Sequence, residues 1–144
     1  GMRISEVANL KTENIKDNSL TDEAYATQPE RNIPLNLPAK AAIDSYLAQR
    51  PKVKSSYVFI SKNGKPLAVR NIRATIDRYM QRADVPNYSV NDLRTTFIVE
   101  NLRAGVDLML LSQVMGHKRL STTERYLELA GTTKPGKRQN LIEL

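Results

Sequence analysis

The second half of the sequence alternates between segments of helical periodicity and residues that end helices. Apolar side chains recur at intervals of three and four residues over 70–83, the spacing of one helix face, and Pro86 ends this pattern. Ser89 and Asp92 resemble a capping box, so a second helix is expected to begin there and to stop at Gly105. A chain with this alternation is expected to fold as a series of short helices joined by tight turns.

Two more short helices are predicted farther along the chain. The apolar segment 107–115 has the composition of a buried helix, and Gly116 breaks it. Ser121 and Glu124 have the spacing of another capping box. This box predicts a last short helix, which contains Tyr126.

The first half of the sequence predicts fewer helices and some β-structure. Helical patterns cover 4–10 and 39–49, while 23–35 is interpreted as a weak β-hairpin with its better strand at 31–35. A short buried strand is expected at 57–60, followed by a turn at 62–64. The whole sequence therefore predicts a mainly α fold with a small antiparallel β-sheet, an α+β fold.

Composition excludes several classes of function. The 144 residues include no cysteine, which rules out disulfides, thiol catalysis and cysteine-ligated zinc. His117 is the only histidine, so a multi-histidine metal site is impossible. No apolar run approaches the roughly 18 residues of a membrane helix, and no signal peptide opens the chain. We expect a soluble cytoplasmic domain.

Positive charge is concentrated in one stretch of the sequence. The chain has 22 Lys and Arg against 15 Asp and Glu, a net charge of +7, and no acid lies between Asp44 and Asp77. Such a stretch is typical of a surface that faces phosphates, although an ordinary solvated face remains an alternative. The basic residues of this stretch are Arg50, Lys52, Lys54, Lys62, Lys65, Arg70 and Arg73.

Three short motifs occur in an order that is characteristic of one enzyme family. In segment 113–126, a Gly-His turn precedes Tyr126 by nine residues, counted from His117. This segment resembles the C-terminal signature of the tyrosine recombinases, the phage integrase family. Residues 1–7 resemble the first arginine motif of that family, and residues 91–97 resemble the motif with its second arginine. The resemblance covers residues 1 to about 130.

The resemblance implies DNA cleavage without a metal or other cofactor. Arg3 and Arg94 would bind the scissile phosphate, because a guanidinium makes two hydrogen bonds to phosphate and keeps its charge. His117 would donate to the same phosphate or assist the nucleophile, and Glu6 would orient Arg3. Tyr126 would attack phosphorus and form a 3′-phosphotyrosyl intermediate.

Double-stranded DNA and further recombinase protomers are the partners that the resemblance implies, with no membrane. The chain would then act in the cytoplasm at the nucleoid. Besides the seven basic residues above, Lys118 and Arg119 are candidates for DNA contacts.

The sequence departs from the family pattern at two positions. Asn91 stands three residues before Arg94, where the family has a histidine, and an amide cannot transfer a proton. The family's hairpin lysine would fall near Ala26 or Thr27, yet 17–39 contains no lysine. In the family this lysine protonates the leaving oxygen, and the loss of such a general acid costs roughly 10²–10⁴-fold in rate.

The resemblance also predicts a domain organisation. Residues 1–130 are expected to form a partial tyrosine recombinase catalytic domain that lacks its first helices, and 131–144 a basic C-terminal tail. Missing helices would leave apolar surface open to self-association.

Three hypotheses on function follow. The first is a recombinase catalytic fragment, in which the residues that match the motifs cut and rejoin DNA. The second is a degenerate fragment that binds DNA without cutting it, which Asn91 and the missing lysine favour. The third is a helical interaction domain without enzymatic activity, which predicts no cluster of phosphate-binding groups.

Overall fold

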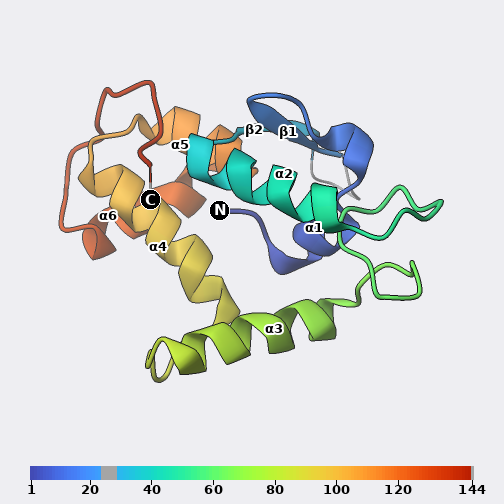
Figure 1. Ribbon diagram of the computed structural model, residues 1–144. Coiled ribbons are helices and arrows are strands. Elements are labelled where there is room, and N and C mark those ends of the chain that lie inside the picture. The colour runs from blue at the N-terminus through green and yellow to red at the C-terminus, as the bar shows by residue number, and fades with distance from the viewer. Residues whose placement is uncertain (24–28, 144) are drawn as a thin grey trace. The chain divides into compact units, whose positions relative to one another are not determined.

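The computed structural model describes residues 1–23 and 29–143 (Figure 1). These residues form two compact units. One unit, called the mixed unit below, contains residues 3–23 and 32–90; the other, the helical unit, contains residues 1–2, 29–31 and 91–143.

The mixed unit contains two helices of 13 and 14 residues together with several short elements. They are α1 (Ile4–Asn9), the 3₁₀ helix η1 (Thr12–Asn14), β1 (Ser19–Asp22), β2 (Arg31–Pro34, whose first residue belongs to the helical unit), α2 (Leu37–Gln49) and α3 (Val69–Arg82). The helical unit contains α4 (Val90–Arg103, whose first residue belongs to the mixed unit), α5 (Leu108–Met115) and α6 (Leu120–Leu129).

The two-stranded sheet differs from the predicted hairpin in its first strand. β1 pairs with β2, but β1 ends at Asp22, before the segment in which the hairpin was expected to begin. Leu20 is buried and is the only apolar residue of β1, so the strand has no alternating pattern that a sequence could show. β2 does alternate, with Arg31 and Ile33 on its buried side.

The predicted strand at 57–60 is wrong. Tyr57 forms an isolated bridge with Lys11, and Ile60 forms another with Pro66. Val58 is only 1% exposed, which accounts for the apolar pattern without a continuous strand. The turn that follows is present, because the Ser61 nitrogen donates to Lys65 across it.

Local sequence explains how α2 begins. The side chain of Asn36 accepts a hydrogen bond of 2.9 Å from the nitrogen of Ala39, which makes Asn36 the N-cap. Pro38 lies in the first turn, where no intrahelical N–H is lost. The helix therefore begins at Leu37, two residues before the predicted start.

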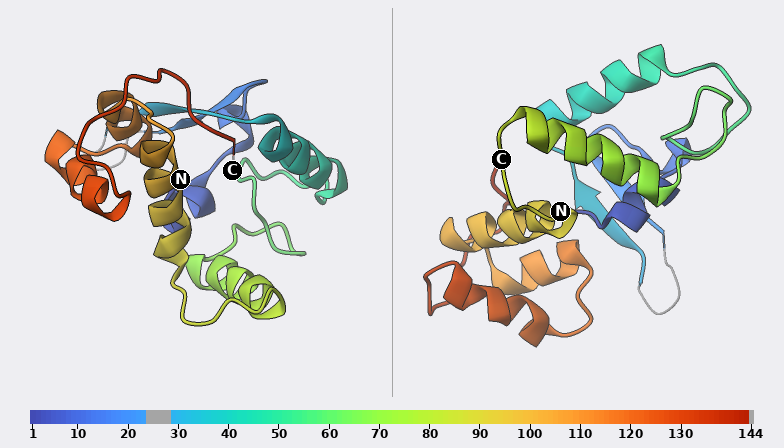
Figure 2. Two further views of the ribbon diagram at one scale, coloured as in Figure 1. Left: turned by 90° about the vertical axis from the view of Figure 1, so that its left-hand side faces the viewer. Right: turned by 90° about the horizontal axis from the view of Figure 1, so that it is seen from below.

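The core of the helical unit lies among its three helices and the turns between them. In both views of Figure 2, α5 and α6 lie next to each other. The buried side chains are Ile98, Val99, Leu102, Val106, Leu108, Leu111, Met115 and Ala130. Gly105 has a φ of +77° at the end of α4, as the predicted stop requires. The Asp107 carboxylate caps α5 by accepting from Met109 and Leu110 at 3.0 and 2.9 Å.

The capping box predicted for α6 is wrong. The helix begins at Leu120, so Ser121 lies inside its first turn, and the N-cap is Arg119 without a side-chain bond. The physical reason is the earlier start of the helix, because a residue that already has helical geometry cannot cap the first turn with its side chain. The Thr123 hydroxyl lies within hydrogen-bond distance of the His117 ring.

The segment after residue 130 packs against the rest of the helical unit. Its backbone pairs with the turn after α4, since the Asp107 nitrogen donates to Arg138 at 2.7 Å and Arg138 donates to Gly105 at 2.9 Å. The Ile142 nitrogen donates at 3.0 Å to the side-chain oxygen of Asn101, which is fully buried. The Asn101 amide nitrogen in turn donates at 2.8 Å to Phe97. A boundary at 130/131 stays a prediction.

The elements agree with the expected mainly α fold and its small sheet. Across residues 1–23 and 29–143, no helix combines the length and the apolar character needed to cross a membrane.

Candidate active site

Arg94 lies in the first half of α4, and contacts of its guanidinium with Gly1, Met115 and His117 lie within the helical unit. Nη1 donates to the carbonyl of Gly1 at 2.5 Å, and Nη2 donates to the carbonyl of Met115 at 2.6 Å. Nη2 also lies 3.3 Å from Nε2 of His117. The planar guanidinium therefore connects the start of the chain, the end of α5 and the imidazole.

His117 owes its position to a left-handed turn. Gly116 has a φ of +65°, and the His117 nitrogen donates at 3.0 Å to the Ser112 carbonyl, five residues earlier. This is the Schellman arrangement, which ends a helix and sets the direction of the next residue. The turn places the half-buried His117 ring between Arg94 and Thr123, whose hydroxyl lies 2.8 Å from Nδ1.

Tyr126 lies on α6 beside the same imidazole. The two rings are stacked, with centroids 6.5 Å apart and planes inclined by 9°. Tyr126 is half-buried and also packs against the core of the helical unit, so its ring has a defined orientation. Three of the four residues proposed from the motifs, Arg94, His117 and Tyr126, are thus neighbours within one unit.

Arg31 also supports this site, although sequence reasoning assigned it no role. It is only 7% exposed, and its Nε donates at 2.8 Å to the carbonyl of Val114. Arg31 and Arg94 therefore bind the carbonyls of two consecutive residues at the end of α5, Val114 and Met115. The sequence did contain one signal for this role. Arg31 and Ile33 alternate with exposed residues along β2, so Arg31 lies on the buried side, where a charged side chain needs hydrogen-bond partners.

A side chain at Gly116 is expected to lower the stability of the fold. A Cβ there would lie 2.7 Å from Nη1 of Arg31, in a backbone conformation that L-residues rarely adopt. Gly116→Ala should lower the free energy of unfolding by about 2–4 kcal/mol, of which the left-handed backbone accounts for about 1–2 kcal/mol. Urea denaturation measures this loss.

Gly105→Ala is the matched control for that variant. Gly105 has a similar φ of +77°, but nothing lies within 4 Å of its added Cβ. It should lose only the backbone contribution, about 1–2 kcal/mol. Equal losses in the two variants would contradict a role for the close approach of Arg31.

Arg3 belongs to the mixed unit and pairs there with Glu6, as expected. Its backbone nitrogen donates to one carboxylate oxygen at 2.6 Å, and Nη1 donates to the other at 2.7 Å. The Glu6 side chain is 10% exposed, so this pair at the start of α1 has a defined geometry. The role of Glu6 as the residue that orients Arg3 stays a prediction.

The two departures from the family pattern differ in what can be described. Asn91 is exposed in the first turn of α4, one turn before Arg94. The family's lysine would fall near Ala26 or Thr27, and these two positions lie outside the described residues.

Arg50 differs from the other basic residues that were predicted to contact DNA. Its guanidinium donates to three backbone carbonyls of the loop after α2, at 3.1 Å to Val58, 2.8 Å to Ser55 and 2.6 Å to Tyr57. Arg50 thus organises this loop. The exposed candidates are Lys52, Lys54, Lys62, Lys65, Arg70, Arg73, Lys118 and Arg119.

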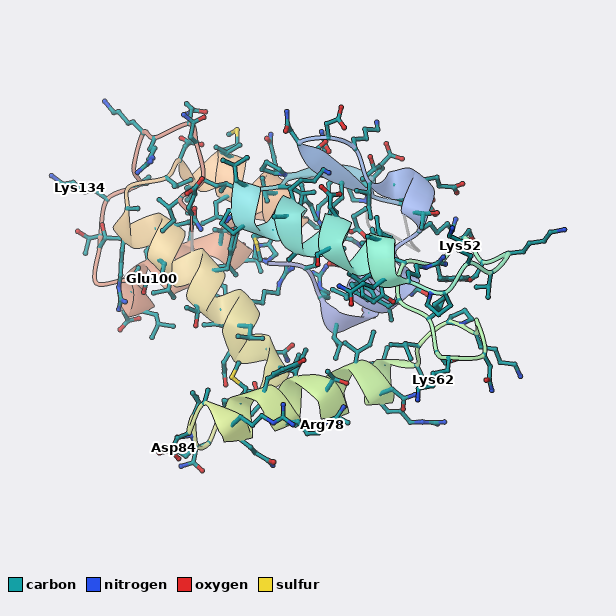
Figure 3. The ribbon with its side chains drawn as sticks, viewed as in Figure 1. Lys52, Lys62, Arg78, Asp84, Glu100 and Lys134 are labelled. Atoms are coloured by element: carbon teal, nitrogen blue, oxygen red, sulfur yellow. The ribbon has the colours of Figure 1, made fainter. Side chains whose placement is uncertain are left out.

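The basic surface of the mixed unit continues beyond the stretch found in the sequence. Figure 3 shows Lys52 and Lys62 on the loops between α2 and α3, and Arg78 on α3. Arg78 and Arg82 line a shallow hollow on that helix. The sequence did not predict Arg78 and Arg82 as part of this surface, because they follow Asp77, the acid at which the acid-free stretch ends.

The Asp77 carboxylate has a hydrogen-bond partner within its own unit. The Tyr88 hydroxyl donates to this carboxylate. Partial burial, together with this carboxylate, raises the pKa of Tyr88 to about 12. The acid that interrupts the basic stretch in sequence therefore faces a tyrosine, and a count of charges along the sequence does not reveal this.

Metal ligands are not grouped in the part of the chain that the structure describes. There, no three His, Cys, Asp or Glu side chains lie close enough together to hold an ion.

Comparisons with known proteins agree with the motifs. The Phage integrase family matches residues 1–132. Tyrosine recombinase XerC of Staphylococcus carnosus is 33% identical over 135 residues, which are 90% of this chain and 46% of that protein. Tyrosine recombinase XerA of Pyrococcus furiosus is 29% identical over 150 aligned positions, covering 99% of this chain and 52% of the relative. The chain thus spans about half the length of these relatives.

Solved structures show the same fold. The crystal structure of XerA recombinase superposes with a TM-score of 0.79 at 24% identity, over 86% of this chain and 47% of the other. A post-cleavage complex of XerH recombinase with its difH substrate gives 0.77 at 20% identity, over 90% and 39% of the two chains. The fold is therefore that of a tyrosine recombinase catalytic domain, and the chain belongs to the phage integrase family.

Proposed function

We propose that this chain is the catalytic part of a site-specific tyrosine recombinase, which cleaves and rejoins double-stranded DNA. The observation that carries this proposal is the contact of Arg94 with His117, whose ring stacks on that of Tyr126. A guanidinium, an imidazole and a phenol in one place supply a phosphate-binding group, a proton-transfer group and a nucleophile.

In the proposed reaction, the Tyr126 oxygen attacks phosphorus and the bond from phosphorus to the 5′-oxygen breaks. The phenol loses a proton and the leaving 5′-oxygen gains one, so the step needs no external reactant. Arg94 and Arg3 stabilise the negative charge on the phosphoryl oxygens. The reverse step, attack by a 5′-hydroxyl on the phosphotyrosine, rejoins the strand.

The motif residues include no obvious general acid for protonation of the leaving 5′-oxygen. Asn91 cannot donate as an acid would, and no lysine occurs in 17–39. The reaction is therefore expected to be slow, and a solvent molecule would protonate the leaving oxygen. DNA binding without cleavage is the outcome that the test below has to distinguish.

Covalent trapping tests the proposal. The probe is a pool of labelled duplexes with a nick, randomised in the base pairs on both sides of it. Cleavage a few nucleotides from the nick releases a short oligonucleotide, so the adduct cannot revert. We expect a labelled protein band that survives denaturation, with the DNA attached to the peptide that contains Tyr126. Binding of the pool without any adduct would favour the DNA-binding fragment.

The DNA face of the mixed unit is proposed to include its exposed basic residues. Lys52→Ala should weaken duplex binding and reduce the salt dependence of the affinity by about one unit of slope, because each neutralised phosphate releases counterions. Fluorescence anisotropy with a mixed-sequence duplex between about 50 and 200 mM salt measures this slope.

Arg50→Ala is the counterpart of that variant. Arg50 donates hydrogen bonds to backbone carbonyls of the same loop, so its loss should lower the free energy of unfolding by about 2–3 kcal/mol. The salt slope should not change. A reduced slope in Arg50→Ala, with stability unaltered, would show that Arg50 contacts DNA after all.

We also propose that the chain works at chromosomal or element DNA in the cytoplasm, together with other protomers. Its relative XerH has been solved bound to a palindromic substrate, and the Tn1549 integrase in complex with transposon-end DNA. Complexes of this chain with duplex DNA should therefore be tested for more than one bound copy.

A further inference from the structure

The end of α5 contains four backbone carbonyls that the helix itself cannot satisfy, as at any helix C-terminus. The backbone of the turn that follows satisfies two of them. Gly116 donates to Gln113 and His117 donates to Ser112, both at 3.0 Å. The carbonyls of the last two residues of the helix remain for other donors.

Two guanidiniums bind these remaining carbonyls. Nε of Arg31 donates to Val114 at 2.8 Å, and Nη2 of Arg94 donates to Met115 at 2.6 Å. Arg31 is buried, and its guanidinium lies against Gly116, where an added Cβ would be 2.7 Å from Nη1. The two arginines thus divide the last carbonyls of one helix between them.

We propose that Arg31 is a positioning residue, which holds the end of α5 so that Arg94 can bind the scissile phosphate. By binding Val114, it leaves the Met115 carbonyl as the acceptor that orients Arg94. By packing against Gly116, it fixes the turn that follows this carbonyl. The inference rests on the proposed function, because the orientation of Arg94 matters for the reaction only if a phosphate binds there.

The charge of Arg31 contributes as well as its hydrogen bond. The carbonyls at a helix C-terminus carry a partial negative charge, which repels a phosphate. If Arg94 alone were bound there, the helix end would offset part of its positive charge. Arg31 is buried, so solvent screens its charge little, and it offsets the helix end in place of Arg94. More of the charge of Arg94 is then available to the phosphate.

Hydrogen exchange of the chain without DNA tests the structural part of this proposal. Arg31→Met keeps an unbranched side chain of similar length and removes the donors. The amide hydrogens of Gly116 and His117 close the turn after α5. In the variant they should exchange about tenfold faster, because the lost hydrogen bond had a charged donor.

The turn that ends α4 is the matched internal control. There the nitrogens of Gly105 and Val106 donate to carbonyls of α4, both at 3.0 Å, in the same arrangement. Equal acceleration at both turns would mean that Arg31 adds only to global stability, and the proposal would be wrong. Arg50→Met removes a guanidinium from carbonyls of the mixed unit, so exchange at Gly116 should not change.

Adduct formation on the nicked pool tests the effect on the reaction. With saturating protein and at a temperature where the variant is folded, Arg31→Met should slow the single-turnover rate by up to the roughly 10²-fold that a displacement of about 1 Å costs. Arg31→Lys keeps the charge and one donor, so its rate should lie between the two. An unchanged rate in Arg31→Met overturns the proposal. If that variant does not fold, Arg31→Lys replaces it, and wild-type exchange and rate in Arg31→Lys overturn the proposal.

A double-mutant cycle tests whether Arg31 acts through Arg94. In the background of Arg94→Lys, the substitution Arg31→Met should slow adduct formation much less than in the wild type, because the guanidinium that it positions is already absent. Equal slowing in both backgrounds would show that Arg31 acts independently of Arg94, which contradicts the proposal. If the wild type forms no adduct at all, the proposed function fails, while hydrogen exchange still decides whether Arg31 holds the turn.

Discussion

Tyr126→Phe is expected to bind duplex DNA as tightly as the wild type and to form no covalent adduct. Removing one oxygen takes away the nucleophile, while the ring keeps its stacking on His117 and its packing against the core of the helical unit. The free energy of unfolding should therefore change by less than about 1 kcal/mol. Adduct formation on the nicked pool and anisotropy with the same duplexes measure the two quantities.

Tyr79→Phe is the matched control. Tyr79 is 63% exposed on α3, so it is an accessible phenol outside the helical unit. This variant should form the adduct at the wild-type rate. If Tyr126→Phe still formed an adduct, another residue would be the nucleophile, and the assignment from the signature motif would be wrong.

Arg94→Lys should slow adduct formation by about 10²–10³-fold, the cost of losing an aligned donor to a transition-state oxyanion. A lysine keeps the charge but not the planar arrangement of donors, so it cannot bind Met115, His117 and a phosphate in the same geometry. Affinity for duplex DNA should fall by much less, because other basic residues supply most of the attraction. Single-turnover rates at saturating protein separate the two effects.

Arg103→Lys controls for the general effect of this substitution. Arg103 lies on the same helix, is exposed, and pairs with Glu100 at 2.6 Å. Exposed pairs of this kind contribute little, so rate and stability should stay close to those of the wild type. A loss of less than tenfold in Arg94→Lys would contradict a role for Arg94 at the scissile phosphate.

Local sequence was sufficient to predict most helices of the fold. The ends of α4 and α5 follow from Gly105 and Gly116, since a left-handed residue after a helix favours glycine. Signals of this kind act within a few residues and need no knowledge of the rest of the chain. These signals place each motif residue on its helix or turn, whereas a common site for the motif residues was implied only by the family resemblance.

Two features that were missed depend on contacts between distant segments. Arg31 bonds to Val114, 83 residues away, and nothing near Arg31 in the sequence indicates that partner. β1 was missed because its pairing with β2, rather than its own pattern, makes it a strand. The failure at α6 was local, because the helix begins at Leu120 and Ser121 therefore lies inside its first turn, where it cannot be the N-cap.

The buried amide of Asn101 has a consequence for hydrogen exchange. Amides close to the end of a chain normally exchange with solvent at nearly unhindered rates. The Ile142 nitrogen, however, donates to the side-chain oxygen of Asn101, a fully buried residue whose amide nitrogen donates to the Phe97 carbonyl. Exchange of that one hydrogen therefore requires the segment to detach from α4, so its protection factor measures the free energy of that opening.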